Sequence, residues 1–102
     1  MRPPLELVRI VDGKRYSVAT ATLLAGDDWW DGHNYERYGR NTFLYRTPGG
    51  RYFVVTLTCW QGERDKLVPV LQNEAVSIYE NDLPKHYVEY AEAFPGVKIV
   101  DA

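Results

Sequence analysis

Residues 42–60 constrain the fold of this chain more than any other stretch, because two β-rich runs flank the sequence Thr47-Pro48-Gly49-Gly50. Proline presets φ and glycine tolerates positive φ, so this tetrapeptide predicts a tight turn between antiparallel strands. A three-residue loop pairs Tyr45 with Phe53, whereas a two-residue loop places Arg46 beside Phe53. We expect the three-residue loop, because it leaves no arginine on the apolar face.

In this register the side chains alternate between two faces of the hairpin. One face collects the apolar side chains Phe43, Tyr45, Phe53, Val55 and Leu57. The opposite face carries Tyr52, Val54, Thr56, Thr58 and Trp60. Cys59 falls on the apolar face, and free cysteine is among the most buried residue types, so we predict a buried structural thiol.

Two further strands and a long loop are predicted before this hairpin. Residues 5–11 favour a first strand, and Asp12-Gly13-Lys14 follows as a turn because Asp-Gly tolerates positive φ. The β-branched and apolar content of residues 20–30 favours a second strand. Residues 31–41 are polar without a clean period, which predicts a loop of a length that is often functional in compact domains.

After the hairpin the chain predicts one strand and two helices. Residues 67–71 favour a short strand, and Pro69 places it at a sheet edge because proline donates no ladder hydrogen bond. A helix over 73–80 follows, and a second helix starts at Asp82-Leu83-Pro84, capped by the aspartate, and stops at Pro95-Gly96. The apolar stripes are Leu71, Ala75, Ile78 and Tyr79 in the first helix and Tyr87, Val88, Ala91 and Phe94 in the second.

The order of these elements predicts the fold class. Strands precede helices, which favours an α+β fold with a small antiparallel sheet of three to five strands and two C-terminal helices on one face. Residues 97–100 either add a short last strand or trail behind the second helix. The chain has 102 residues, the size of one domain with one core, so we expect a single domain over 1–102.

Charge and cysteine content exclude several classes of protein. Twelve Lys and Arg against 14 Asp and Glu give a net charge of −2, without the basic excess typical of nucleic-acid binders. Cys59 is the only cysteine, so no intrachain disulfide forms, and a reducing, cytoplasmic setting is expected. No apolar run approaches the roughly 20 residues of a membrane helix, so no membrane contact is expected.

The densest cluster of potential metal ligands comprises Asp27, Asp28, Asp31, His33 and Glu36. Carboxylates with imidazole suit divalent metals or general acid–base chemistry, but the spacing matches no calcium loop and no zinc motif. The other interpretation is a solvated acidic loop. A reactive Cys59 would need a nearby base, and the sequence places neither His33 nor an exposed His86 beside it. We therefore expect no metal, no cofactor and no catalytic residue.

A second constellation interleaves aromatic side chains with arginine around the two predicted connections 31–41 and 60–66. If the second to fourth strands form a meander, these connections lie at the same end of the sheet. Such side chains serve as protein hot spots, stack on single-stranded bases, or close the end of a core. The candidate binding residues are Tyr35, Arg37, Tyr38, Arg40, Trp60 and Arg64, with Trp29 and Trp30 beside them.

Three stretches resemble a family of short uncharacterised proteins from bacterial genomes, phages and conjugative elements. They are Asp12-Gly13-Lys14-Arg15-Tyr16 followed by Thr20-Ala21-Thr22-Leu23; Thr42-Phe43-Leu44-Tyr45-Arg46-Thr47 leading to Tyr52-Phe53; and Leu67-Val68-Pro69-Val70-Leu71 followed by Glu74-Ala75. Members often open with Gly-Lys-Arg-Tyr-Asp-Thr-x-Thr-Ala, where this chain has Ser17-Val18 in place of Asp-Thr. The resemblance spans most of residues 8–80 and implies a genomic context, not an activity.

Together these observations favour a non-enzymatic interaction protein of a mobile element or its bacterial host, which binds another protein. By association with that context, an inhibitor of host defence is the extreme case. The alternative is a single-stranded nucleic-acid or nucleotide binder, which the net charge disfavours. A small metal-dependent hydrolase comes third. The sequence specifies neither the partner nor the oligomeric state.

Overall fold

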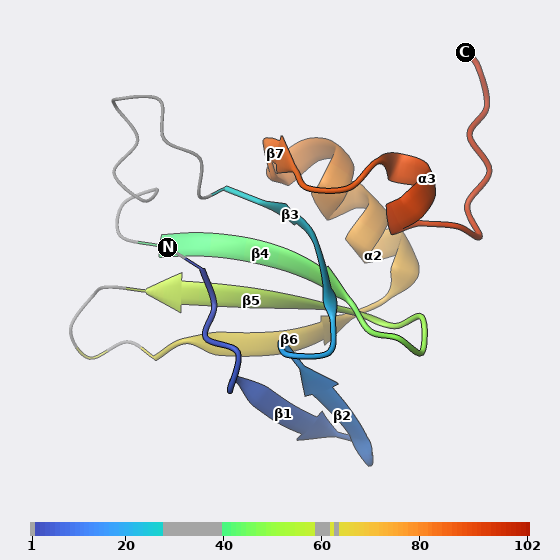
Figure 1. The fold of residues 1–102 in the computed structure, drawn as a ribbon. Helices are drawn as coiled ribbons and strands as arrows, with labels where there is room; N and C mark the ends of the chain where they lie inside the picture. The colour runs from blue at the N-terminus through green and yellow to red at the C-terminus, as the bar shows by residue number, and fades with distance from the viewer. Residues whose placement is uncertain (1, 28–39, 59–61, 63) are drawn as a thin grey trace.

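The computed structural model describes residues 2–27, 40–58, 62 and 64–102. In these ranges the chain is an α+β fold with a five-stranded antiparallel sheet, a two-stranded hairpin and two short C-terminal helices, which confirms the predicted class (Figure 1). The strands are β1 Val8–Val11, β2 Lys14–Ser17, β3 Thr22–Gly26, β4 Arg40–Arg46, β5 Tyr52–Thr58, β6 Lys66–Val70 and β7 Lys85–His86. The helices are α2 Gln72–Ser77, the π-helix η1 Ile78–Asp82 that continues it, and α3 Tyr90–Ala93. None of the helices in these ranges is long and apolar enough to cross a bilayer.

The central hairpin has the expected register. β4 and β5 pair antiparallel with Tyr45 opposite Phe53 and Phe43 opposite Val55. The turn is closed by a hydrogen bond from Gly50 N to Thr47 O at 3.0 Å, and Gly50 has φ of +84°, which favours glycine. β6 pairs with β5 at one edge of the sheet order β6-β5-β4-β3-β7, as Pro69 predicts.

Apolar side chains are buried on both faces of the sheet, where we expected a single core. One cluster lies on the helix side and comprises Leu24, Ala25, Leu44, Tyr52, Ala75, Tyr79, Leu83, Ala93 and Phe94. The other lies on the hairpin side and comprises Tyr16, Val18, Phe43, Tyr45, Phe53, Val55, Leu57 and Leu67. The β1–β2 hairpin and the C-terminal helices therefore each cover one face of the same sheet.

The N-terminal segment differs from the prediction. The Asp12-Gly13 turn is present, with φ of +53° and +74°, but it joins β1 to a second strand, β2, that we did not predict. β3 spans only Thr22–Gly26 of the strand expected over 20–30, and residues 28–30 lie outside the described ranges. The expected loop 31–41 is also shorter at its end, because β4 begins at Arg40.

The second predicted helix is wrong over most of its length. Lys85 and His86 form β7 against β3, and only the four residues of α3 are α-helical. Asp82 is the last residue of η1, not a cap. In the first helix Ala75 and Tyr79 are buried as expected, whereas Leu71 is 68% exposed at the N-terminus of α2. Residues 97–100 form no strand.

Candidate binding pocket beside the π-helix

The predicted site at the sheet end is only partly within the described residues. Tyr35, Arg37, Tyr38 and Trp60 lie outside them, as do Trp29 and Trp30. Arg40 opens β4 opposite Thr58, the last residue of β5, and Arg64 is exposed just before β6. Because β3 to β6 form a meander, the strand ends that flank both connections do lie at one end of the sheet.

The one described member of the acidic cluster, Asp27, has a structural role. Its buried carboxylate Oδ1 accepts hydrogen bonds from Thr42 N at 2.7 Å and from Asn41 Nδ2 at 3.2 Å, which tie the end of β3 to β4. Asp28, Asp31, His33, Glu36 and Cys59 lie outside the described ranges. Over the residues that the structure does describe, no three potential metal ligands lie together.

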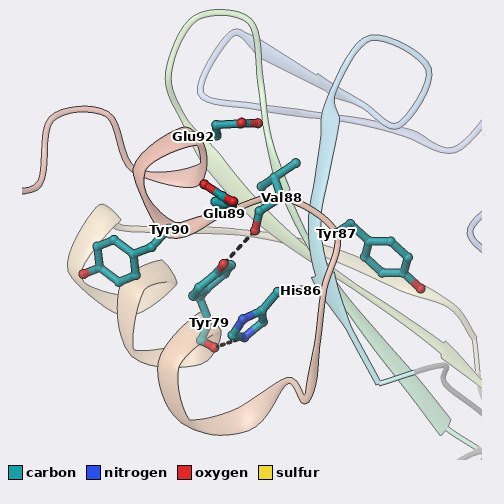
Figure 2. Close-up of a pocket in the computed structure, with 7 residues that line it drawn as sticks. All are labelled: Tyr79, His86, Tyr87, Val88, Glu89, Tyr90 and Glu92. Atoms are coloured by element: carbon teal, nitrogen blue, oxygen red, sulfur yellow. Dashed lines mark hydrogen bonds between the residues drawn. The ribbon is translucent and has the colours of Figure 1, made fainter.

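An open pocket of about 460 Å³ lies on the C-terminal part of the fold (Figure 2). It lies where η1, β7 and the start of α3 come together. Aromatic and carboxylate side chains supply most of its lining, which comprises Tyr79, His86, Tyr87, Val88, Glu89, Tyr90 and Glu92. The pocket is therefore built from three successive elements of the chain, η1, β7 and α3.

Two contacts between His86 and Tyr79 hold one wall of the pocket in place. The imidazole stacks on the phenol ring with 3.8 Å between ring centroids. Its Nε2 lies 2.8 Å from the Tyr79 carbonyl oxygen, as the dashed line in Figure 2 shows. His86 is exposed, as expected, but it belongs to β7 and not to a helix.

Hydrogen bonds of their hydroxyl groups also hold the rings of Tyr79 and Tyr90 in place. The Tyr79 hydroxyl donates to Val88 O at 2.7 Å, and the Tyr90 hydroxyl donates to a Glu80 carboxylate oxygen at 3.0 Å. The two tyrosine rings meet edge to face at 5.7 Å, and each packs on Phe94. These walls are therefore preorganised before any ligand binds.

The rim of the pocket is acidic. Glu89 and Glu92 are exposed, and residues 71–102 hold six Asp and Glu against two Lys, a formal charge of −4. Burial raises the pKa of the Tyr79 hydroxyl, and the negative charge of Glu89 raises it further. The lining itself thus holds two carboxylates, while the cations Arg2 and Lys85 lie against its residue Tyr87.

Tyr87 also belongs to the lining, but in Figure 2 its ring points away from Tyr79 and His86, and it contacts two cations of the chain. The Arg2 guanidinium carbon lies 4.4 Å from the centroid of the Tyr87 ring, and Lys85 Nζ lies 5.1 Å from it. Backbone pairing fixes this residue, because Tyr87 N donates to Leu24 O at 2.9 Å. This ring is therefore already in contact with a guanidinium group of the chain itself.

Sequence reasoning missed this pocket because it placed all the lining residues after Tyr79 in one continuous helix. Tyr87 and Val88 were placed in an apolar stripe, whereas both are half-buried in an extended segment that leads from β7 to α3. The concentration of tyrosine and glutamate between Tyr79 and Glu92 was the available signal. Comparisons with protein-family models, with curated proteins and with solved structures find no match to this chain.

Proposed function

We propose that this chain is a non-enzymatic module that binds another protein, and that the pocket receives a side chain of that partner. The observation that carries the proposal is the open pocket, whose Tyr79, His86 and Tyr90 walls are fixed by hydrogen bonds. Rigid aromatic side chains in pockets concentrate binding energy at protein interfaces. Because the walls are preordered, less conformational entropy is lost on association.

The shape of the pocket supports a protein side chain over a whole small molecule. Sites for small molecules bury most of the ligand and are lined mainly by apolar groups. Here the pocket is open, and Glu89, Glu92 and His86 on its lining are exposed. A polar recess of this kind suits the end of one side chain, while the rest of the partner covers the surrounding surface.

The experiment begins with a partner isolated from the source cell and purified, and measures its affinity for three forms of the chain. Val88→Phe enlarges a pocket side chain without changing charge, and Arg37→Ala/Arg40→Ala alters the site that the sequence predicts at the sheet end. We expect Val88→Phe to weaken binding at least fivefold, about 1 kcal/mol, while the chain keeps its native fold at the temperature of the measurement.

Two outcomes of this experiment contradict the proposal. Full affinity in Val88→Phe with loss in Arg37→Ala/Arg40→Ala would move the site to the sheet end. If the retained partner is a single-stranded nucleic acid, and its affinity falls steeply with salt, the chain is a nucleic-acid binder instead.

A further inference from the structure

The polar atoms of the pocket are mostly hydrogen-bond acceptors. A carbonyl oxygen only accepts, so the contact with Tyr79 O requires His86 Nε2 to carry a hydrogen. In the neutral imidazole this leaves Nδ1 with a free lone pair. The Tyr79 hydroxyl uses its hydrogen on Val88 O, so it offers no donor to a ligand. Such a lining selects a ligand that is rich in donors.

The carboxylates of Glu89 and Glu92 add negative charge to these acceptors. Within the described part of the chain, neither carboxylate has an ion-pair or side-chain hydrogen-bond partner. Both side chains belong to the lining of the pocket, together with Tyr79 (Figure 2). A ligand that enters here is attracted by unpaired negative charge, in the acidic C-terminal part of the molecule.

We propose that the pocket recognises an arginine side chain of the partner protein, an inference that rests on the proposed function. Guanidinium offers five N–H donors in a planar fork and binds carboxylates in bidentate fashion. Lysine presents a single, more strongly hydrated charge with three donors and matches a spread of acceptors less well. A guanidinium group is known to lie against one residue of the lining, because the Arg2 guanidinium carbon is 4.4 Å from the centroid of the Tyr87 ring.

The test uses short blocked peptides of the form Gly-X-Gly, with X as arginine, lysine or citrulline, titrated into the isotope-labelled chain. Citrulline is a neutral isostere of arginine, so it isolates the contribution of charge. At low salt we expect saturable shifts of the backbone amide resonances of residues 86–92, with dissociation constants on the order of millimolar for arginine. Citrulline should bind at least fivefold more weakly, and lysine more weakly than arginine.

Two double variants make the assignment specific. Glu89→Gln/Glu92→Gln should abolish the preference for arginine over citrulline. Glu6→Gln/Asp101→Asn removes the same charge from exposed positions outside the pocket and should preserve it. Equal binding of arginine and citrulline, shifts scattered over the whole surface, or equal loss in both double variants would overturn the inference. Equal binding of the lysine and arginine peptides would show that the pocket accepts any cation and does not recognise arginine in particular.

Failure of this inference is distinguishable from failure of the proposed function. If Val88→Phe disrupts the purified complex while the arginine peptide does not bind, the pocket is an interface with another occupant, and the arginine assignment is wrong. If Val88→Phe leaves the complex intact, the pocket is not the interface, and both proposals fall.

Discussion

His86 closes the π-helix through Tyr79, since its Nε2 lies 2.8 Å from the Tyr79 carbonyl oxygen while its ring stacks on the phenol at 17° between planes. In η1 the Leu83 N–H donates to Ile78 O, five residues back, instead of to Tyr79 O. The Tyr79 carbonyl therefore takes its donor from β7. This contact fixes the helix end and the pocket wall together.

Substitutions of His86 separate the contribution of its hydrogen bond from that of its ring stacking. His86→Phe keeps a stacking ring and loses the hydrogen bond, so we expect a loss of about 0.5–1.5 kcal/mol in the free energy of unfolding. His86→Ala also removes the stacking, which contributes a further amount of about 0.5–1.5 kcal/mol. Urea denaturation measures both. If the two variants are as stable as the original chain, neither contact stabilises the fold.

Phe53 tests the hairpin register. Its side chain is fully buried, stacks on Tyr45 at 5.1 Å and meets Tyr16 edge to face at 5.9 Å. Phe53→Ala should reduce the free energy of unfolding by about 3–5 kcal/mol, the range for a large core deletion. Thr56→Ala, on the other face of β5, should cost much less. An unchanged denaturation midpoint in Phe53→Ala would show that the register is wrong.

Ionisation of the Tyr52 hydroxyl makes the free energy of unfolding depend on pH in the alkaline range. Burial raises the pKa of its hydroxyl above 10.0, against a smaller opposing influence of Arg46, and the hydroxyl donates to Ala93 O at 3.1 Å. The folded chain thus keeps this proton where the unfolded chain loses it. The contribution of protonated Tyr52 to the free energy of unfolding is complete below about pH 10 and falls as the pH rises further.

Tyr52→Phe removes that titration. Urea denaturation at a series of pH values from about 8 to 11 should give a shallower fall in stability for the variant than for the original chain. Tyr79 and Tyr90, whose pKa values burial also raises, remain in both proteins and set the residual slope. Identical slopes would mean that Tyr52 ionises equally in both states.

The sequence was sufficient where local chemistry and side-chain alternation agree. Between Thr42 and Thr58 the turn residues and the apolar period specify the same register, and the structure has it. β2 was missed because Lys14, Arg15 and Ser17 show no apolar alternation. Its strand conformation depends on pairing with β1 and on packing of Tyr16 against the sheet, which are tertiary contacts.

The second helix failed for a related reason. Residues 87–94 have a helical apolar period, but the edge of β3 needs backbone partners because Leu24 and Ala25 are fully buried. Residues 85–87 supply them: β7 pairs with Ala25 and Gly26, and Tyr87 N donates to Leu24 O. The pairing of β3 with residues 85–87 is a long-range interaction that no local sequence pattern indicates. The pocket that results from it could therefore not be predicted.

Arg9 attaches the N-terminal hairpin to the opposite edge of the sheet. Its Nη1 donates to Leu67 O at 2.7 Å, so an exposed β1 side chain binds the backbone of the edge strand β6. Exposed edge strands invite pairing with other chains, and a side chain on the edge carbonyl obstructs this, as does Pro69, which lacks an N–H. Arg9 therefore links the two-stranded and five-stranded sheets.

Arg9→Ala should loosen the hairpin without unfolding the sheet. Loss of one partly exposed hydrogen bond of about 1 kcal/mol raises amide exchange in β2 about fivefold, because local opening follows its own free energy. Exchange in β5 should stay unchanged. Arg15→Ala is the matched control, since Arg15 is an exposed arginine of the same hairpin, opposite Ile10 in β1. Equal acceleration in both variants would show that charge on the hairpin, and not the contact with Leu67, governs its attachment.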